Sequence, residues 1–585
     1  MFKLFKHLRG KDYLFIVLAV LFIAGQVGLE LKMPEYMSAI TRLVQTEGSE
    51  MSEILHNGGL MLLCAFGSLI STIIAGYFVS IIGADFSFII RKKIFDKVES
   101  LSINEVKKFS TSSLITRTTN DITQTRMLIT MGANMLVRAP LSAIWAIAKI
   151  NGKSWEWSTA TSIAVVIMLA TVITTMMIVI PRFKVIQKLT DKLNGVTREN
   201  LTGIRVVRAF NAEKYQEHKF DHSNAELAGI TRFVDRVMSV TSPMMYMVMN
   251  GITLAIYLIG AYLISNSTMA GKLTYFSDMV VFSSYAMHVI MSFLMVAMIF
   301  MMIPRAQVSA DRINEVLNQE ITIKDGNFDD ETAEVGTVEF RNVSFKYPDA
   351  EEYLLKNISF KAERGQTVAF IGSTGSGKST LINLVPRFYD ATDGAVFVDG
   401  VNVKDYKQKA LRRKLGYVPQ KAVIFSGTVA SNISYGDSGN GKPSEKQIQT
   451  AARVAQAKNF VEKLDKQYNA HIAQSGTNIS GGQKQRLAIA RAVARNPEIY
   501  IFDDSFSALD YKTDAALRQA LKEHTKDATS LIVAQRIGTI MHADQIVVLD
   551  KGECVGQGTH KELMKNCEVY KEIALSQLSK EELNV

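Results

Sequence analysis

A glycine-rich segment at 372–380 has the residue types and spacing of a phosphate-binding loop. It follows the apolar stretch 368–371 and precedes the helical pattern 381–385, which is the strand–loop–helix context that the motif requires. Glycines let backbone N–H groups turn toward phosphate oxygens, and the start of the next helix adds its positive dipole end. We expect Lys378 to reach the terminal phosphates and the Ser379 hydroxyl to bind Mg²⁺. The residues predicted to hold the nucleotide phosphates are Gly372, Ser373, Thr374, Gly375, Ser376, Gly377, Lys378, Ser379 and Thr380.

Two further segments fit a nucleotide site. The apolar stretch 499–502 ends in Asp503 and Asp504, and a carboxylate at a strand end suits a Mg²⁺ ligand, taken directly or through water. Acidic turns after buried strands are common, so this pattern alone leaves a structural role open. The second segment precedes the helical pattern 484–494 and offers another anion-binding start of a helix; its residues are Ser480, Gly481, Gly482 and Gln483. Two phosphate-facing loops in one domain indicate that each nucleotide lies between two copies of the domain.

The elements that position these loops occupy only the second half of the chain. Composition changes near residue 320, from long apolar runs to short strands, glycine turns and amphipathic helices. The fold class predicted is therefore a multidomain membrane protein, with an all-α transmembrane domain (1–320), a linker (321–335) and an α/β nucleotide-binding domain (336–585). Six stretches reach the roughly 20 apolar residues that cross a bilayer. They are Tyr13–Tyr36, Gly59–Gly83, Met127–Ile150, Ser158–Pro181, Val240–Ile264 and Met279–Ile303.

Charge placement predicts the orientation in the membrane. Four Lys and Arg residues precede Tyr13, eight lie in 84–126 and eleven lie in 182–239. Basic residues favour the cytoplasmic side, so we expect the amino terminus, both long loops and the nucleotide-binding domain there. Much of the net charge of +10 is then explained by the basic cytoplasmic loops of a membrane protein, which argues against a nucleic-acid partner. Three scattered cysteines exclude a disulfide framework.

The order of the motifs resembles an ATP-binding cassette (ABC) domain. The phosphate loop (Walker A) is followed by Ser-Gly-Gly-Gln at 480–483, by the strand ending at Asp503 (Walker B) and by Ser-Ala-Leu-Asp at 507–510. The resemblance covers about 336–577, and it implies ATP and Mg²⁺ as cofactors and ATP hydrolysis as the reaction. Its positions imply that Tyr347 stacks on adenine, and that Gln420 contacts Mg²⁺ and the membrane domain.

The membrane half is similar to the exporter arrangement of the same family. Six apolar stretches precede the cassette in one chain, and the loop segments 114–121 and 199–210 resemble those of exporters. This resemblance implies a half-transporter that acts as a dimer in the plasma membrane, with its ATPase domain on the cytoplasmic side. Both long loops keep a helical pattern, so they are either levers toward the ATPase domain or solvated helix.

Two residues depart from the family pattern. Asp504 stands where the family usually has the Glu that orients the attacking water, and Gln535 stands where it usually has a His. Asp is one methylene shorter, and a misplacement of about 1 Å can cost on the order of 10²-fold in rate. Gln535 can form hydrogen bonds but cannot transfer a proton. We therefore assign Asp504, Gln535 and Gln420 to the catalytic positions of a weakly hydrolytic site.

This combination resembles the degenerate-site subunit of heterodimeric bacterial multidrug exporters. It implies a partner half-transporter that carries the Walker B Glu and the switch His, and whose site does most of the hydrolysis. Segment 480–483 would complete that site, and Ile479 replaces the usual Leu there. A homodimer in which both changes are harmless is the alternative. The implied function is ATP-driven export of hydrophobic or amphipathic compounds.

The substrate is indicated by two features of the membrane half. Thirteen of the 26 methionines lie within 238–302. Those at helical spacing in the last stretch include Met287, Met291, Met295 and Met298. A methionine-lined cavity adapts to varied apolar molecules, although a helix-packing stripe gives the same pattern. Glu30 is an ionisable group at membrane depth, so it either attracts cationic drug-like substrates or pairs with Lys32.

Three other functions fit the same motifs. An importer of metal chelates on the exporter fold differs in direction, which a transport assay would show. A lipid or peptide flippase differs in substrate. A regulatory subunit binds ATP but transports nothing, and substrate-stimulated ATPase that is lost when Gly481 is changed would argue against it. Membrane lipid surrounds the chain in each case.

Overall fold

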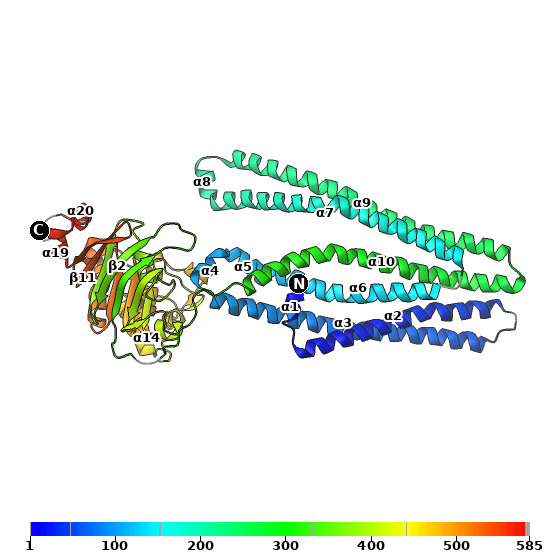
Figure 1. The fold of residues 1–585 in the computed structure, drawn as a ribbon, viewed down its shortest axis with the longest axis horizontal. Coiled ribbons are helices and arrows are strands. Elements are labelled where there is room, and N and C mark those ends of the chain that lie inside the picture. The colour runs from blue at the N-terminus through cyan, green and yellow to red at the C-terminus, as the bar shows by residue number, and fades with distance from the viewer. Residues whose placement is uncertain (1, 47, 151–153, 330–331, 440, 580–585) are drawn as a thin grey trace. The chain divides into compact units, whose positions relative to one another are not determined.

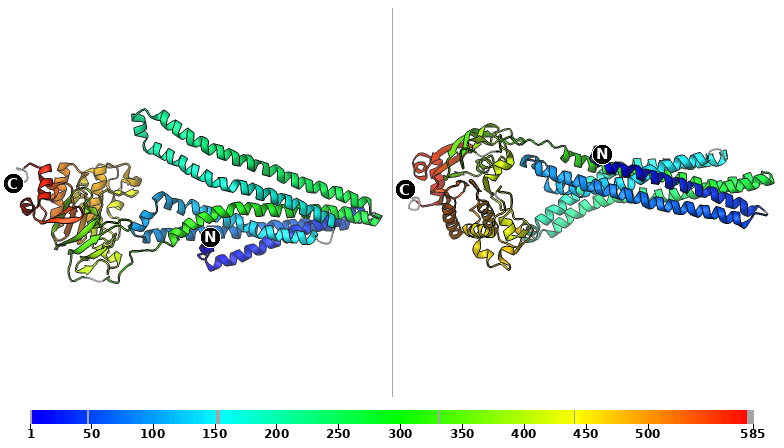
Figure 2. Two further views of the ribbon diagram at one scale, coloured as in Figure 1. Left: turned by 45° about the horizontal axis from the view of Figure 1, so that its top comes forward. Right: turned by 90° about the horizontal axis from the view of Figure 1, so that it is seen from below.

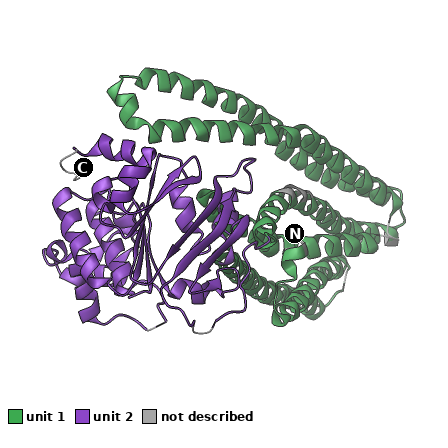
Figure 3. Cartoon of the chain, turned by 60° about the vertical axis from the view of Figure 1, so that its left-hand side comes forward, with its two compact units in different colours: residues 1–99, 109–319 green, residues 100–108, 320–585 purple. Residues whose placement is uncertain are grey.

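The computed structural model describes residues 2–46, 48–150, 154–329, 332–439 and 441–579. Parts of all three predicted segments therefore lie outside the described residues, including 330–331 of the linker and 580–585 of the cassette domain. The chain divides into two compact units (Figure 3). The first comprises residues 1–99 and 109–319, and the second comprises residues 100–108 and 320–585. The short segment 100–108 thus belongs to the second unit, although it interrupts the first along the chain.

The described part of the first unit is helical, with long helices joined by short ones. They are α1 (Phe2–Phe5), α2 (Gly10–Gln45), α3 (Met51–Ser100), α5 (Thr111–Thr118), α6 (Asn120–Ile150), α7 (Trp155–Thr202), α8 (Ile204–Ala209), α9 (Glu213–Ser265) and α10 (Met269–Leu317). Within the described residues, six helical stretches are long and apolar enough to cross a membrane, which confirms the six predicted spans. Helices α3, α7, α9 and α10 have 48 to 53 residues, more than twice the length that a bilayer needs.

Side-chain hydrogen bonds cap the first turns of two of these helices. The Asp12 carboxylate accepts a hydrogen bond from the Arg9 backbone N–H at 2.8 Å and caps α2. Ser110 caps α5, because its hydroxyl oxygen accepts from the Ser113 N–H at 3.2 Å. Between the helices, Trp157 and Tyr285 are almost fully buried. Their polar atoms donate to backbone carbonyls of Ile256 and Leu31 respectively, so these large side chains join helices without leaving a donor unpaired.

Helices α7 and α9 run side by side as a hairpin that diverges from α6 and α10 toward α8 (Figures 1 and 2). Much of their apolar surface is exposed: Met177, Met247 and Tyr262 are 73%, 68% and 69% exposed. An apolar helix surface of this kind is stable only against lipid or another protein surface.

The second unit contains three sheets. Its strands are β1 (Val338–Phe345), β2 (Leu355–Ala362), β3 (Thr367–Gly372), β4 (Asp393–Val398), β5 (Val401–Asn402), β6 (Leu415–Val418), β7 (Gly427–Thr428), β8 (His471–Ile472), β9 (Ile499–Asp503), β10 (Thr529–Val533), β11 (Gln545–Asp550) and β12 (Glu553–Gly558). A six-stranded sheet has the order β12-β11-β3-β10-β9-β6, parallel except for β12, and a four-stranded antiparallel sheet has the order β2-β1-β4-β5. This α/β unit after the six-helix membrane unit confirms the predicted fold class.

The helices of the second unit surround these sheets. They are α4 (Ile103–Lys108), α11 (Lys378–Asn383), α12 (Gln408–Arg413), α13 (Val429–Ile433), α14 (Glu445–Val454), α15 (Lys458–Val461), α16 (Gly481–Ala494), α17 (Tyr511–His524), α18 (Ile537–Ile540), α19 (His560–Asn566) and α20 (Glu568–Gln577). The parallel strands are buried on both faces, which explains their nearly continuous apolar sequences. In register, Val533 of β10 pairs with Phe370 of β3 and with Asp503 of β9. The carboxyl ends of these three strands therefore meet at one edge.

Candidate functional site

The phosphate-binding loop lies at that edge, between β3 and α11. Gly375 and Gly377 have φ angles of +86° and +93°, a region that favours glycine. At Gly377 a Cβ would also come within 2.6 Å of Leu355 Cδ2. Both positions therefore require glycine, and the loop can curl so that its backbone N–H groups face one centre.

Lys378 is held inside this loop. Its Nζ donates hydrogen bonds to the carbonyl oxygens of Gly372 and Ser373 at 2.8 and 2.7 Å, and to the Ser376 hydroxyl at 3.3 Å. Burial lowers the pKa of Lys378, while the nearby carboxylates of Asp504 and Asp503 oppose that shift. The ammonium group thus lies within reach of both the loop and the carboxylates, where a phosphate contact would be charge-assisted.

Ser379 and Asp503, both predicted metal ligands, are in contact. The Ser379 hydroxyl donates to Asp503 Oδ1 at 2.7 Å, and Asp503 is only 5% exposed. Burial raises the pKa of Asp503, with the Ser379 hydrogen bond acting against it. A hydroxyl and a buried carboxylate are hard oxygen donors that fit Mg²⁺, which usually takes few protein ligands together with phosphates and water. Among the described residues, no group of three His, Cys, Asp or Glu side chains could hold a metal by itself.

The Asp504 carboxylate is held by two amides. Gln420 Nε2 donates to its Oδ2 at 3.2 Å, and Gln535 Nε2 donates to the same oxygen at 2.8 Å. Asp504 has a φ of +46°, and its N–H donates to the Val533 carbonyl at 3.0 Å, which ties the end of β9 to the end of β10. Burial raises the pKa of the Asp504 carboxyl, opposed by its hydrogen bond from Gln420. The structure therefore brings the three residues at the predicted catalytic positions together around one oxygen.

Tyr347 lies beside the phosphate loop. Its hydroxyl is 3.0 Å from the Thr380 hydroxyl, and its ring packs edge-on against Phe345 and Tyr389. Lys107 of α4 adds a cation over the rings of Tyr347 and Tyr389, each at 5.6 Å, and donates to the Tyr389 hydroxyl at 3.0 Å. This hydrogen bond raises the pKa of Lys107, so the contact holds a charged ammonium. Tyr347 is thus fixed by contacts on several sides.

The segment 480–483 starts α16. The Ser480 hydroxyl accepts from the Gln483 N–H at 3.3 Å, and Gln483 Oε1 accepts from the Ser480 N–H at 2.8 Å. This reciprocal capping box uses the Gln483 side chain. An added Cβ at Gly481 would meet no atom within 4 Å. In the part of the chain that the structure describes, the hydrogen bonds of 480–483 stay within α16 and its start.

Comparisons with known proteins agree with a membrane unit followed by a nucleotide-binding unit. The family profile of the ABC transporter transmembrane region matches residues 16–293, and that of the ABC transporter matches residues 355–507. An uncharacterized ABC transporter ATP-binding protein of Mycobacterium tuberculosis is 38% identical over 525 residues, which is 89% of this chain and 87% of that protein. This chain belongs to the ABC transporter family.

Two further relatives and one solved structure are also similar to this ABC transporter. The uncharacterized protein YfiB of Bacillus subtilis is 34% identical over 569 residues and covers 96% of both chains. An ATP-dependent lipid A-core flippase of Pseudomonas aeruginosa is 32% identical over 506 residues, 86% of this chain and 82% of that protein. The solved structure of a bacterial Atm1-family ABC exporter with ATP bound has a TM-score of 0.78 and 24% identity, covering 97% and 99% of the two chains, so they share a fold. The protein is a multi-pass membrane half-transporter of this fold.

Lys378→Ala is expected to weaken nucleotide binding at this transporter's own phosphate loop. A charge-assisted hydrogen bond contributes about 1.5–3 kcal/mol, so affinity should fall on the order of 10- to 100-fold. Photolabelling with an azido-ATP analogue, followed by separation of the subunits, would report this chain alone. Lys446→Ala, an exposed lysine on α14, is the control. Equal labelling of both variants would contradict the assignment.

The predicted substrate residues lie in α2 and α10. The methionine stripe is partly accessible: Met291 and Met298 are 43% and 41% exposed, and Met287 and Met295 are half-buried. The apolar core of the membrane unit uses other residues of α10, among them Phe282 and Val289. The four methionines are not among the residues of this core, and the alternative of a helix-packing stripe stays open.

Glu30 pairs with a residue that the sequence did not indicate. Arg138 Nη2 of α6 donates to both Glu30 oxygens, at 3.0 and 2.9 Å. The alternative that paired Glu30 with Lys32 is wrong, because residues two apart on a helix do not face each other. Its ion partner comes from another helix, 108 residues further along the chain.

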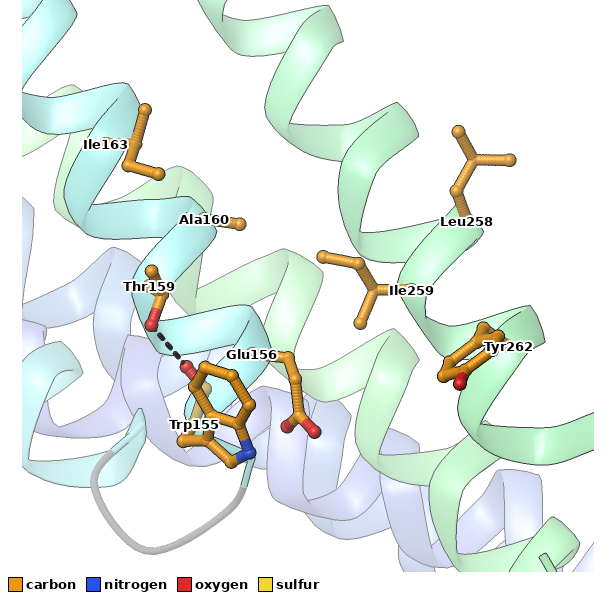
Figure 4. Close-up of a pocket in the computed structure, with 8 residues that line it drawn as sticks. All are labelled: Trp155, Glu156, Thr159, Ala160, Ile163, Leu258, Ile259 and Tyr262. Carbon is orange, nitrogen blue, oxygen red and sulfur yellow. Dashed lines mark hydrogen bonds between the residues drawn. The ribbon is translucent and has the colours of Figure 1, made fainter. Parts of the chain in front are cut away.

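A separate apolar groove lies between α7 and α9, at the ends of these helices near Trp155 and Tyr262 (Figure 4). Its volume is about 530 Å³, and Ile163, Leu258 and Ile259 also line it. None of the predicted substrate residues lines this groove. Aromatic side chains at the ends of membrane helices commonly mark the interface with water.

Two contacts at the nucleotide site were not predicted. Gln577, at the end of α20, donates to the Gln535 carbonyl at 2.8 Å and accepts from the Ile537 N–H at 2.8 Å. It therefore brackets the loop that carries Gln535. Lys107 reaches Tyr389 from a helix 282 residues earlier in the chain. No local motif signals either contact, because each depends on how distant segments pack.

Proposed function

We propose that this ABC transporter is the weakly hydrolysing half of a heterodimeric exporter of hydrophobic or amphipathic compounds. The observation that carries the proposal is the Asp504 carboxylate, held at one oxygen by the amides of Gln420 and Gln535. Both amides are permanent donors, and neither can accept a proton from water. The shorter carboxylate and the missing imidazole affect hydrolysis, while the contacts for binding nucleotide remain.

The retained contacts support a role in ATP binding. Lys378 lies in the phosphate loop, and Ser379 meets Asp503 in the pair suited to Mg²⁺. ATP bound with Mg²⁺ would supply the charged phosphates that draw two cassettes together. In this proposal the capped loop 480–483 completes the partner's nucleotide site, where most of the hydrolysis takes place.

Closure of the two cassettes would then drive the membrane helices. Segment 100–108 belongs to the cassette unit, and its Lys107 contacts the rings of Tyr347 and Tyr389 beside the nucleotide site. We propose that such contacts pass cassette closure to the long helices and open the substrate cavity outward. Hydrolysis at the partner's site would reset the transporter.

The substrate cavity of the proposal includes Glu30 and the methionine stripe. The exposure of Met291 and Met298 supports this choice, since flexible thioethers suit varied apolar molecules. Lipid translocation is a second candidate function. It is favoured by the 32% identity to a lipid A-core flippase and by the arginine that faces Glu30.

Co-expression with a half-transporter that carries the Walker B Glu and the switch His tests the proposal. The pair is expected to purify at equal stoichiometry with substrate-stimulated ATPase, and this chain alone is expected to hydrolyse ATP slowly because Asp504 and Gln535 are poor replacements. Subunit ratios and ATPase of both preparations would be measured in the same lipid nanodiscs. A stable homodimer with rapid turnover would show that the heterodimer proposal is wrong.

A further inference from the structure

The carboxyl-terminal helix α20 packs on the six-stranded sheet of the cassette unit (Figure 1). Its Tyr570 and Ala574 are fully buried, and they belong to one apolar cluster with Ile371 of β3 and Ile537 of α18. Removing these side chains from water fixes the helix on the sheet. The last residue of α20, Gln577, is thereby placed beside the loop that joins β10 to α18.

The side-chain amide of Gln577 spans the loop that carries Gln535. Its Nε2 donates to the Gln535 carbonyl at 2.8 Å, and its Oε1 accepts from the Ile537 N–H at 2.8 Å. Within the described residues, Arg536 at the cap position makes no side-chain hydrogen bond to the start of α18. The first N–H groups of a helix have no acceptor inside the helix, so the Gln577 oxygen supplies one. Because an amide has both a donor and an acceptor, one side chain holds both ends of the turn.

A second side chain holds the same segment from another helix. Arg518 of α17 donates from Nη1 to the Gly538 carbonyl at 2.7 Å, and its Nη2 lies 3.2 Å from Asp514 Oδ2. The segment 535–538 is therefore fixed at its backbone by both α17 and α20. Of the two side chains, Gln577 is the one bonded to the backbone of Gln535 itself.

The loop held in this way places the Gln535 amide on the Asp504 carboxylate. Gln535 Nε2 donates to Asp504 Oδ2 at 2.8 Å. Gln577 is bonded to the carbonyl of the same residue, so its contact and the contact at Asp504 share one backbone position. A shift of about 1 Å in a group at a reacting centre can cost on the order of 10²-fold in rate. The position of residue 535 is therefore critical for any hydrolysis that Asp504 supports.

We propose that Gln577 is a positioning residue for ATP hydrolysis at this chain's own site. It acts through Gln535, because it holds the loop so that the Gln535 amide stays on the carboxylate at the position of the attacking water. This inference deepens the proposed function and rests on ATP hydrolysis at this site, whether slow or rapid. Lys378 and the contact between Ser379 and Asp503 are separate from this loop, so nucleotide binding and hydrolysis should respond differently to a change at Gln577.

Hydrolysis by the assembled transporter tests the role of Gln577. The partner's Walker B glutamate is changed to glutamine so that only this chain's site turns over, and release of radiolabelled phosphate is followed for hours to detect a slow site. Gln577→Ala is expected to lower the maximal rate by about tenfold and to change the ATP concentration at half-maximal rate by less than about twofold. Glu572→Ala, at an exposed residue of the same helix, is the matched control and should change neither.

A double-variant cycle separates positioning from a general loss of structure. If Gln577 acts through Gln535, then adding Gln577→Ala to Gln535→Ala should lower the rate by less than about twofold further. A loss of packing would lower the rate in both backgrounds. Backbone hydrogen exchange gives an independent readout: the Ile537 N–H should exchange at least about tenfold faster in Gln577→Ala, with the unfolding midpoint of the cassette unchanged.

The outcomes for the inference and for the proposed function differ. The inference is wrong if Gln577→Ala hydrolyses ATP as the unaltered transporter does, if its full effect persists in the Gln535→Ala background, or if the unaltered site does not hydrolyse ATP at all. Rapid hydrolysis at the unaltered site would instead contradict the proposed weak site. In that case the comparison of the Gln577 and Gln535 variants would still decide the inference.

Discussion

Replacing Gly481 by glutamine is expected to lower the ATPase rate of the assembled transporter by about 100-fold or more, the cost of losing close contacts to a reacting phosphate. Gly481 is the first residue of α16, after the Ser480 cap. An added Cβ would meet no atom of this chain within 4 Å, so the substitution should leave the cassette folded. The side chain would instead occupy the space where the partner's nucleotide approaches the loop.

The measurement is steady-state ATPase of the purified pair. Gly195→Gln on α7 is a matched control, because a Cβ there also meets nothing within 4 Å. Asp504→Ala should lower turnover only modestly, since the proposal assigns most hydrolysis to the partner's site. If Asp504→Ala is as inactive as Gly481→Gln, this chain's own site is catalytic and the degenerate-site proposal is wrong.

The double substitution Asp504→Glu/Gln535→His is expected to raise hydrolysis at this chain's own site by about 100-fold. The longer carboxylate would recover roughly 1 Å of reach toward the attacking water, and an imidazole can exchange a proton. The two changes belong together, because Gln535 Nε2 lies 2.8 Å from Asp504 Oδ2 and neighbours in contact are not additive.

Turnover would be measured in a pair whose partner has its Walker B glutamate changed to glutamine, so that only this chain's site can hydrolyse ATP. The single substitution Gln535→His is the control and should give a smaller gain. An unchanged rate, in a pair that still binds ATP, would mean that these two residues do not limit the site.

The sequence alone was sufficient for the features that depend on local patterns. The phosphate loop is recognisable because its glycines, Lys378 and Ser379 act within one short segment after a strand. The six membrane spans are recognisable because crossing a bilayer requires about 20 consecutive apolar residues. Both depend on neighbours in the chain, so no knowledge of tertiary packing is needed.

Tertiary structure decided which distant residues meet. The family resemblance assigns Asp504 and Gln535 to one site, but their side-chain contact depends on the parallel pairing of β9 with β10. Glu30 was recognised as costly at membrane depth, yet its partner Arg138 lies on another helix. Periodicity shows which side of a helix is apolar and not which helix packs against it. The ion partner of Glu30 therefore followed from helix packing, which no local pattern contains.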